Sequence, residues 1–175
     1  TANVRGNRNL GGLVGTSRGA ISNAYAMGSV TGVASGSTLA QAVGALVGIQ
    51  SGGSITSSYA IGYVAGANDR GGLVGSNPSN VTNSYWDKET TGVPSDAGGT
   101  AKTTADLQGA LPTGFDSAIW GIGENLYPYL KWQYSGTPVA VSGKAYSDAG
   151  SMVLAGADVS AISGGSLLGT ATAGA

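Results

Sequence analysis

The stretch GGLVGTSRGAISNAYAMGSVTG, residues 11–32, decides the fold because two altered copies of it follow in the chain. Its opening block returns as GALVG at 44–48 and as GGLVG at 71–75, so the blocks begin 33 and then 27 residues apart. A second block follows each of them: ISNAYAMGSVTG at 21–32, ITSSYAIGYVAG at 55–66 and VTNSYWDKETTG at 81–92. Self-similarity at this period indicates a repeat architecture.

The residues within each repeat favour strands over helices. Ile21, Asn23, Tyr25 and Met27 alternate with smaller residues, which is the two-residue period of a strand. No stretch has the apolar spacing of an amphipathic helix, and glycines separate the short apolar runs. We therefore expect three short strands in the first repeat, at 13–14, 21–26 and 29–30, joined by glycine-rich corners.

One such repeat cannot bury a face alone, but stacked repeats can. The sequence predicts an all-β fold, a right-handed parallel β-solenoid with one turn per repeat, in which equivalent residues stack on one another. Alternation alone leaves open whether the tyrosines or the alanines face inward. The predicted ladders are Leu13, Leu46 and Leu73; Ile21, Ile55 and Val81; Tyr25, Tyr59 and Tyr85; and a polar ladder of Asn23, Ser57 and Asn83.

Two further segments bear on the array. Residues 4–6 match the repeat ends at 30–32 and 64–66, so we expect the array to extend before residue 1. The expected partners are accordingly further repeats of a longer chain or other copies of this one. The additional residues between the first two repeats, 33–43, are expected to form a loop or an extra strand.

The repeated blocks resemble the GLUG motif of large bacterial surface proteins, including filamentous haemagglutinin-like adhesins. The resemblance covers residues 4–92 closely and extends to about 134, where YWDKETTG and YPYLKWQ resemble the end of such arrays. It implies a secreted or cell-surface protein built from repeats, and the motif carries no catalytic site. The chain departs from the motif at Ala45, Ser57 and Trp86, where we expect locally altered stacking.

The chain divides into three predicted parts. Residues 1–92 form the solenoid, 93–134 an aromatic C-terminal cap with one short helix, and 135–175 an incomplete β-sandwich. Thr103 followed by Asp106 is typical of a helix start. The last part resembles a carboxypeptidase-regulatory-like or Ig-like module, with strands expected at 139–148, 154–161 and 167–172. Too short to close a sandwich, it suggests filament formation by strand complementation from another molecule.

Aromatic residues concentrate in the cap, where an open solenoid end would need covering. They are Phe115, Trp120, Tyr127, Tyr129, Trp132 and Tyr134. The favoured interpretation is a cap core, because large aromatic rings usually fill cores. The alternative is a carbohydrate-binding module for host or matrix glycans, which would need exposed rings. Its candidate stacking residues are Trp120, Tyr127, Tyr129 and Trp132.

Nothing in the repeats supports catalysis. GTSRG at 15–19 fits a nucleophile elbow around Ser17, but the chain has no histidine to act as base, and a strand follows instead of a helix. Asp87 and Glu89 are spaced for a glycosidase pair, yet Lys88 between them favours a solvated corner. We therefore predict that the chain is not an enzyme.

Composition excludes several other classes. The net charge is −1 with no block of like charge, which argues against a nucleic-acid partner. No apolar run is long enough for membrane insertion. With no cysteine or histidine, the usual zinc sites are absent. We expect no cofactor; calcium at Asp87, Glu89 or Asp96 has only weak support.

These observations together predict a non-enzymatic structural or adhesive segment of a bacterial cell-surface or secreted fibre protein. The solenoid would act as a rigid stalk, and copies of the chain would assemble into filaments. The alternative function is the carbohydrate-binding module described above.

Overall fold

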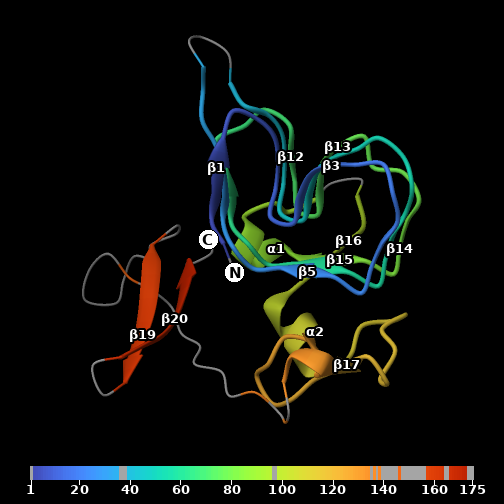
Figure 1. Cartoon of the computed structure of the whole chain (residues 1–175), viewed down its shortest axis with the longest axis vertical. Coiled ribbons are helices and arrows are strands. Elements are labelled where there is room, and N and C mark those ends of the chain that lie inside the picture. The colour runs from blue at the N-terminus through green and yellow to red at the C-terminus, as the bar shows by residue number, and fades with distance from the viewer. Residues whose placement is uncertain are drawn as a thin grey trace.

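A computed structural model describes residues 2–35, 39–95 and 98–134, with 136, 138, 146, 157–163 and 166–172. Short parallel strands dominate the first 102 residues, which coil into stacked turns (Figure 1). The fold is all-β and solenoid-like, as the repeats predict.

Each turn contributes one strand to each of several parallel sheets. Before the first full turn lies β1 (Val4–Gly6). The first turn contains β2 (Arg8–Gly11), β3 (Val14–Ser17), β4 (Ile21–Ser22), β5 (Tyr25–Ala26) and β6 (Val30–Gly32). The second contains β7 (Gln41–Gly44), β8 (Val47–Gln50), β9 (Ile55–Thr56), β10 (Tyr59–Ala60) and β11 (Val64–Ala65). The third contains β12 (Arg70–Gly71), β13 (Val74–Ser76), β14 (Val81–Thr82) and β15 (Tyr85–Asp87), to which β16 (Thr100–Lys102) adds a further strand.

The pairing register follows the sequence repeat. Among the paired residues are Gly11, Gly44 and Gly71; Val14, Val47 and Val74; Tyr25, Tyr59 and Tyr85; and Val4, Val30 and Val64. The predicted turn-on-turn stacking is thereby confirmed for the tyrosine ladder and for residues 4–6. Part of the 33–43 segment is β7, the second turn's counterpart of β2, and Ala40 forms a bridge with Ala67.

The number of strands per turn differs from the prediction. Residues 21–26 form two strands, β4 and β5, because Asn23 between them has a left-handed φ of 48°. Ser57 and Asn83 have φ values of 46° and 47° at the equivalent corners. Asparagine tolerates this region better than most residues. The predicted polar ladder is therefore a row of corner residues, and the prediction of a continuous strand was wrong.

The first and last glycines of each GGLVG-type block allow two sheets to pack backbone against backbone. A Cβ added to Gly48 would lie 2.5 Å from the Gly15 oxygen and 2.6 Å from the Asn9 carbonyl carbon. One added to Gly44 would lie 2.1 Å from the Val47 oxygen. Since no side chain fits, the motif requires glycine where the β2-β7-β12 and β3-β8-β13 sheets meet. We call this contact the glycine seam.

Inside the coil lies a thin core of small and branched side chains. Leu46 and Leu73 are fully buried there, and Ala26 and Ala60 face the same interior, where Trp86 replaces alanine in the third turn. The alanines thus face inward, which answers the question that alternation left open. Leu13 is 47% exposed because its turn lies at the edge of the stack.

After β15 the chain forms α1 (Lys88–Thr91), β16, α2 (Thr104–Gly109), β17 (Trp120–Gly121), β18 (Tyr129–Leu130) and the 3-10 helix η1 (Lys131–Gln133). The predicted short helix is α2, whose N-cap Thr103 forms a capping box with Asp106. Helix α1 was not predicted. In Figure 1, α2 and β17 lie to one side of the coiled turns.

Residues 103–134 cover a side of the solenoid, not only its end. Their contacts reach every turn: Tyr85 donates to the Thr113 oxygen, Tyr59 to the Pro128 oxygen and Tyr25 to Gln133. We call residues 103–134 the lateral segment. The cap expected over the open end therefore lies along the tyrosine face, because the outward tyrosines form an apolar surface that must be buried.

The C-terminal part is described only as an antiparallel hairpin of β19 (Asp158–Ser163) and β20 (Ser166–Thr172). These strands overlap the predicted strands at 154–161 and 167–172. The strand predicted at 139–148 lies outside the described residues except for Tyr146. The Ig-like sandwich thus stays a prediction.

Candidate functional site

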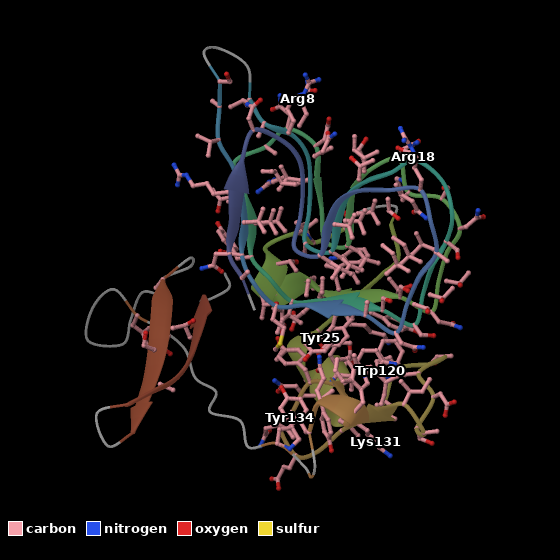
Figure 2. The ribbon with its side chains drawn as sticks, viewed as in Figure 1. Arg8, Arg18, Tyr25, Trp120, Lys131 and Tyr134 are labelled. Carbon is pink, nitrogen blue, oxygen red and sulfur yellow. The ribbon has the colours of Figure 1, made fainter. Side chains whose placement is uncertain are left out.

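The tyrosine ladder is the structural centre of the interface between the solenoid and the lateral segment. The Tyr25 and Tyr59 rings stack with centroids 5.5 Å apart and an interplanar angle of 9°. Their hydroxyls donate hydrogen bonds of 2.6 Å to Gln133 Oε1 and to the Pro128 oxygen, respectively. Figure 2 shows Tyr25 and Trp120 at this junction, with Arg8 and Arg18 on the opposite side of the molecule.

Burial changes the acidity of these phenols. It raises the pKa of Tyr25 to about 12, and the neighbouring Tyr134 adds to the effect. Burial likewise raises the pKa of Tyr59 well above its ordinary value, and charge repulsion from Tyr25 and Tyr127 raises it further. Burial and the adjacent Asp87 carboxylate raise the pKa of Tyr127. All three phenols are therefore neutral at ordinary pH and act as hydrogen-bond donors.

Asp87 joins the solenoid to both helices. Its Oδ1 accepts from the Glu89 and Thr90 amides as the N-cap of α1. Its Oδ2 accepts 2.6 Å bonds from Thr104 Oγ1 and from the Tyr127 hydroxyl. Asp87 is fully buried, so the predicted solvated corner was wrong for this residue.

Glu89 behaves differently from its neighbour. It is exposed and accepts a 2.9 Å hydrogen bond from the Thr104 amide. That bond is the main cause that lowers the pKa of Glu89. Asp87, by contrast, is buried and directed at four protein donors. The two carboxylates therefore do not face a shared cleft, as a glycosidase pair must.

The hydrogen bonds of Asp87 also concern its expected role as a calcium ligand. Four protein donors occupy the Asp87 oxygens, and Asp96 lies outside the described residues. Across 2–35, 39–95 and 98–134, no three acidic, histidine or cysteine side chains gather where they could hold a metal ion. Asp87 thus serves as a connector between elements.

Ser17 is the last residue of β3, before the corner that leads to the short strand β4. The side chain is buried, and its hydroxyl donates to the Gly19 oxygen at 3.1 Å. Its register partner in the second turn is Gln50. The surroundings are those of a corner residue and lack the strand-turn-helix context of a nucleophile elbow.

Gln50 is a buried polar residue that the sequence did not single out. Its Oε1 accepts from the Ser79 amide at 3.0 Å, and its backbone oxygen accepts from Asn77. Its Nε2 has no partner among the described residues. Gln50 therefore holds the corner of the third turn against the second.

The four rings proposed for sugar stacking do not form an exposed row. Trp120 is fully buried and donates its indole N–H to Asn23 Oδ1 at 3.0 Å. Tyr127 is half-buried and bonded to Asp87. Tyr129 is half-buried and packs edge-on against Tyr134. Only Trp132 of the four is largely exposed, at 77%.

A groove of about 530 Å³ runs along the free edge of β5. Residues 23–28 and Leu13 line one side, and Leu130 with residues 132–134 line the other. None of the described residues that line it is charged. We call it the N-terminal groove, since it lies against the first turn.

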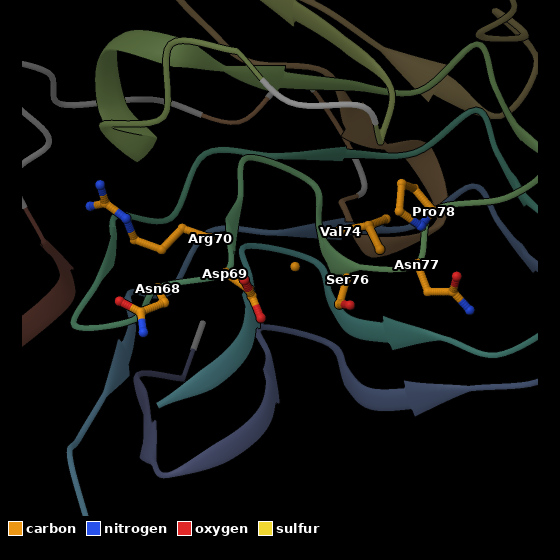
Figure 3. Close-up of a pocket in the computed structure, with 8 residues that line it drawn as sticks. Asn68, Asp69, Arg70, Val74, Ser76, Asn77 and Pro78 are labelled. Carbon is orange, nitrogen blue, oxygen red and sulfur yellow. The ribbon is translucent and has the colours of Figure 1, made fainter. Parts of the chain in front are cut away.

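A second, polar depression of about 440 Å³ lies between β12 and β13. Figure 3 shows Asp69 and Arg70 on one side of it and Ser76 and Asn77 on the other. Asp69, beside Arg70, is the one carboxylate among the described residues that line the depression. The depression lies where the glycine seam reaches the surface at the third turn.

Comparison with known proteins identifies two relatives that are much longer than this chain. The chain is 34% identical over 127 residues to a Gly-rich membrane protein of Evansella cellulosilytica, covering 66% of this chain and 14% of that protein. It is 38% identical over 78 residues to halomucin of Haloquadratum walsbyi, covering 37% of this chain and 1% of halomucin. No protein-family model matches the chain, and no solved structure matches it.

The chain thus spans only a small fraction of either relative. In the part that the structure describes, no helix has the length and apolar character needed to cross a bilayer. The similarity to these two longer proteins therefore concerns only a segment of each.

Proposed function

We propose that this chain is a non-enzymatic structural segment of a cell-surface or secreted protein. The observation that carries the proposal is the in-register stacking of three turns. The lateral segment binds all three turns along the tyrosine face. Successive turns add strands in register to the same parallel sheets, so a run of repeats makes a stiff rod whose length grows with repeat number. Such a rod suits a stalk that holds other surfaces away from a cell.

The surroundings of the polar residues agree with this function. Ser17, Asp87 and Gln50 are buried and serve corners or connections between turns. The two relatives, a Gly-rich membrane protein and halomucin, are long proteins whose names suit a membrane or surface setting. The resemblance to GLUG repeats, which implies a secreted or surface protein, supports the same proposal.

Labelling of intact cells tests this function. An antibody against this chain is expected to label intact cells of the source organism or the surrounding medium. A protease added outside should remove the label without cell lysis. Label that appears only after lysis would contradict the surface proposal.

A carbohydrate-binding role is the second candidate, and only Trp132 favours it. An exposed tryptophan ring can stack on a sugar face. Binding of a neutral oligosaccharide that disappears in Trp132→Ala but survives in Tyr146→Ala, another exposed ring, would support it. Equal binding by both variants would contradict it.

A further inference from the structure

We propose that Arg70 closes the third-turn end of the solenoid, so that no further solenoid turn, of this chain or of another molecule, stacks on it. The inference rests on the proposed structural function, because it says where a stack of turns stops. This end is formed by β12, β13 and β14, the outermost strands of their sheets on the side of the third turn.

The pairing register puts Arg70 in a column of core residues. Arg70 pairs with Val43, and Val43 pairs with Leu10. Val43 and Leu10 are both buried and belong to the apolar core of the coil. Because register partners in stacked strands lie on the same face of the sheet, the third turn places a guanidinium where the first two turns place aliphatic side chains.

The direction of the Arg70 side chain suits the end of a column. Figure 3 shows it directed away from Asp69, as expected for neighbouring residues that alternate across a strand. The side chain is exposed. The methylene stem of an arginine can cover apolar neighbours while its charged group stays in water. An arginine at this position therefore ends the column without presenting a new apolar surface.

A turn stacked on β12 would have to bury this charge. The next turn would add one more residue to the column, and that residue would lie directly over the guanidinium. A charged group without a partner is costly to bury, whereas a valine there would present the same apolar surface as Val43. Inward-pointing charges protect the edges of natural sheets in the same way.

The alanine column ends on a ring instead of a charge. Ala26 pairs with Ala60, and Ala60 pairs with Trp86. Trp86 is buried, its ring lies against Gly72, and its indole N–H donates to the Val93 oxygen at 2.8 Å. Residues that follow the third turn thus cover this part of the core, while β12 stays an outer strand of its sheet.

The outer strands of the third-turn end are also short. β12 and β14 have two residues each, and β13 has three. A short edge offers few backbone groups to a further strand. The backbone and the Arg70 side chain therefore act in the same direction, against stacking on this end.

Arg70→Val tests the inference, because it gives the third turn the residue that the second turn has. The variant should fold as the parent does, judged by circular dichroism. Its self-association in sedimentation velocity should be at least about tenfold tighter than that of the parent, since no charge is then buried in the contact. Arg70→Gln, which is neutral but polar, should tighten association less, and Arg70→Lys should leave it unchanged.

Arg8→Val is the matched control for loss of charge. Arg8 is exposed, and it pairs with Gln41, so its column holds polar residues in both turns. Removing this charge opens no apolar column, and the variant should associate as weakly as the parent.

A bulky label locates the contact, because the chain has no native cysteine. Thr82 in the third turn and Ser22 in the first turn are exposed and belong to one column, since both pair with Thr56. In the Arg70→Val background, a large maleimide adduct on Thr82→Cys should abolish the association. The same adduct on Ser22→Cys should leave it intact.

Equal association of the parent, Arg70→Val and Arg70→Gln, with the fold intact, would overturn the inference. Tightening by Arg8→Val as strong as that by Arg70→Val would also overturn it, as would an adduct at residue 22 that blocks association as well as one at residue 82. None of these results touches the surface labelling that tests the structural function, so the two proposals fail separately.

Discussion

Asn23 shows how one residue sets the shape of a turn. Its left-handed backbone ends β4 and starts β5, while its side chain accepts the indole N–H of buried Trp120. The same residue thus bends the solenoid and ties it to the lateral segment. Ser57 does both at the next corner through its bond to the Gly114 oxygen.

Asn23→Ala is expected to lower the free energy of unfolding by about 2 kcal/mol or more. Alanine is strained in the left-handed conformation, and it leaves the Trp120 indole N–H without an acceptor. Asn23→Gly keeps the conformation available and loses only the hydrogen bond, so its loss should be smaller. Urea unfolding measures both. A larger loss for glycine than for alanine would contradict this account.

Asp87→Asn is expected to cost about 3 kcal/mol, because the amide nitrogen cannot accept from Thr104 and Tyr127 and leaves buried donors unpaired. Thermal and urea unfolding measure the loss. Asp106→Asn, in the exposed capping box of α2, is the matched control and should lose much less. Equal losses would show that Asp87 is not a connector.

At the scale of elements, the glycine seam explains why GGLVG is the most constant part of the repeat. Glycine at its first and fifth positions lets neighbouring strands approach backbone to backbone, as Gly44 and Gly48 do. Alanine at the second position of the middle copy is accommodated, since Ala45 is fully buried in the core.

Gly48→Ala is expected to lower stability by about 3 kcal/mol or to prevent folding, because its Cβ would meet backbone atoms that cannot move aside. Gly19→Ala is the control, since nothing lies within 4 Å of its added Cβ. Circular dichroism during urea unfolding compares the two. A Gly48→Ala protein as stable as Gly19→Ala would refute the seam.

The sequence predicted the turns, their register and helix α2 because each depends on local pattern: the repeat, the spacing of Tyr25, Tyr59 and Tyr85, and the Thr103–Asp106 cap. It mispredicted the strands around Asn23. A residue with a left-handed backbone breaks the strand, but it leaves the alternation of side-chain types in the sequence unchanged. The burial of Asp87 also escaped prediction, because its partners Thr104 and Tyr127 come from distant segments.

At the scale of the whole molecule, the lateral segment turns a stack of repeats into one unit. It covers the outer tyrosines of every turn, with Tyr59 and Tyr85 buried and Tyr25 half-buried, whereas a cap over the end would touch only the last. Its course from Thr113 at the third turn to Gln133 at the first follows from contacts that no local pattern contains.

Stability should fall as the pH rises from about 10 to 12. An unfolded tyrosine releases its proton near pH 10. Tyr25, with a pKa of about 12, and Tyr59, with a pKa raised well above its ordinary value, still hold theirs. The folded state then binds more protons, so raising the pH destabilises it, and the contribution is complete below pH 10.

Circular dichroism and tyrosinate absorbance, followed together, check this. Part of the tyrosinate absorbance change, that of Tyr25 and Tyr59, should come above pH 10 and coincide with unfolding. Full ionisation of all tyrosines near pH 10 with the fold intact would contradict the buried ladder.

The in-register stacking of turns is the central claim, and one disulfide experiment tests it most directly. Thr31 pairs with Ala65 in neighbouring turns, and both are partly exposed. Thr31→Cys with Ala65→Cys should form an intramolecular disulfide in the monomer, because adjacent strands bring the Cα atoms within disulfide range. Thr31→Cys with Tyr63→Cys, displaced by two residues on the same strand side, should form it poorly. Preferential cross-linking of the displaced pair would contradict the stacked solenoid.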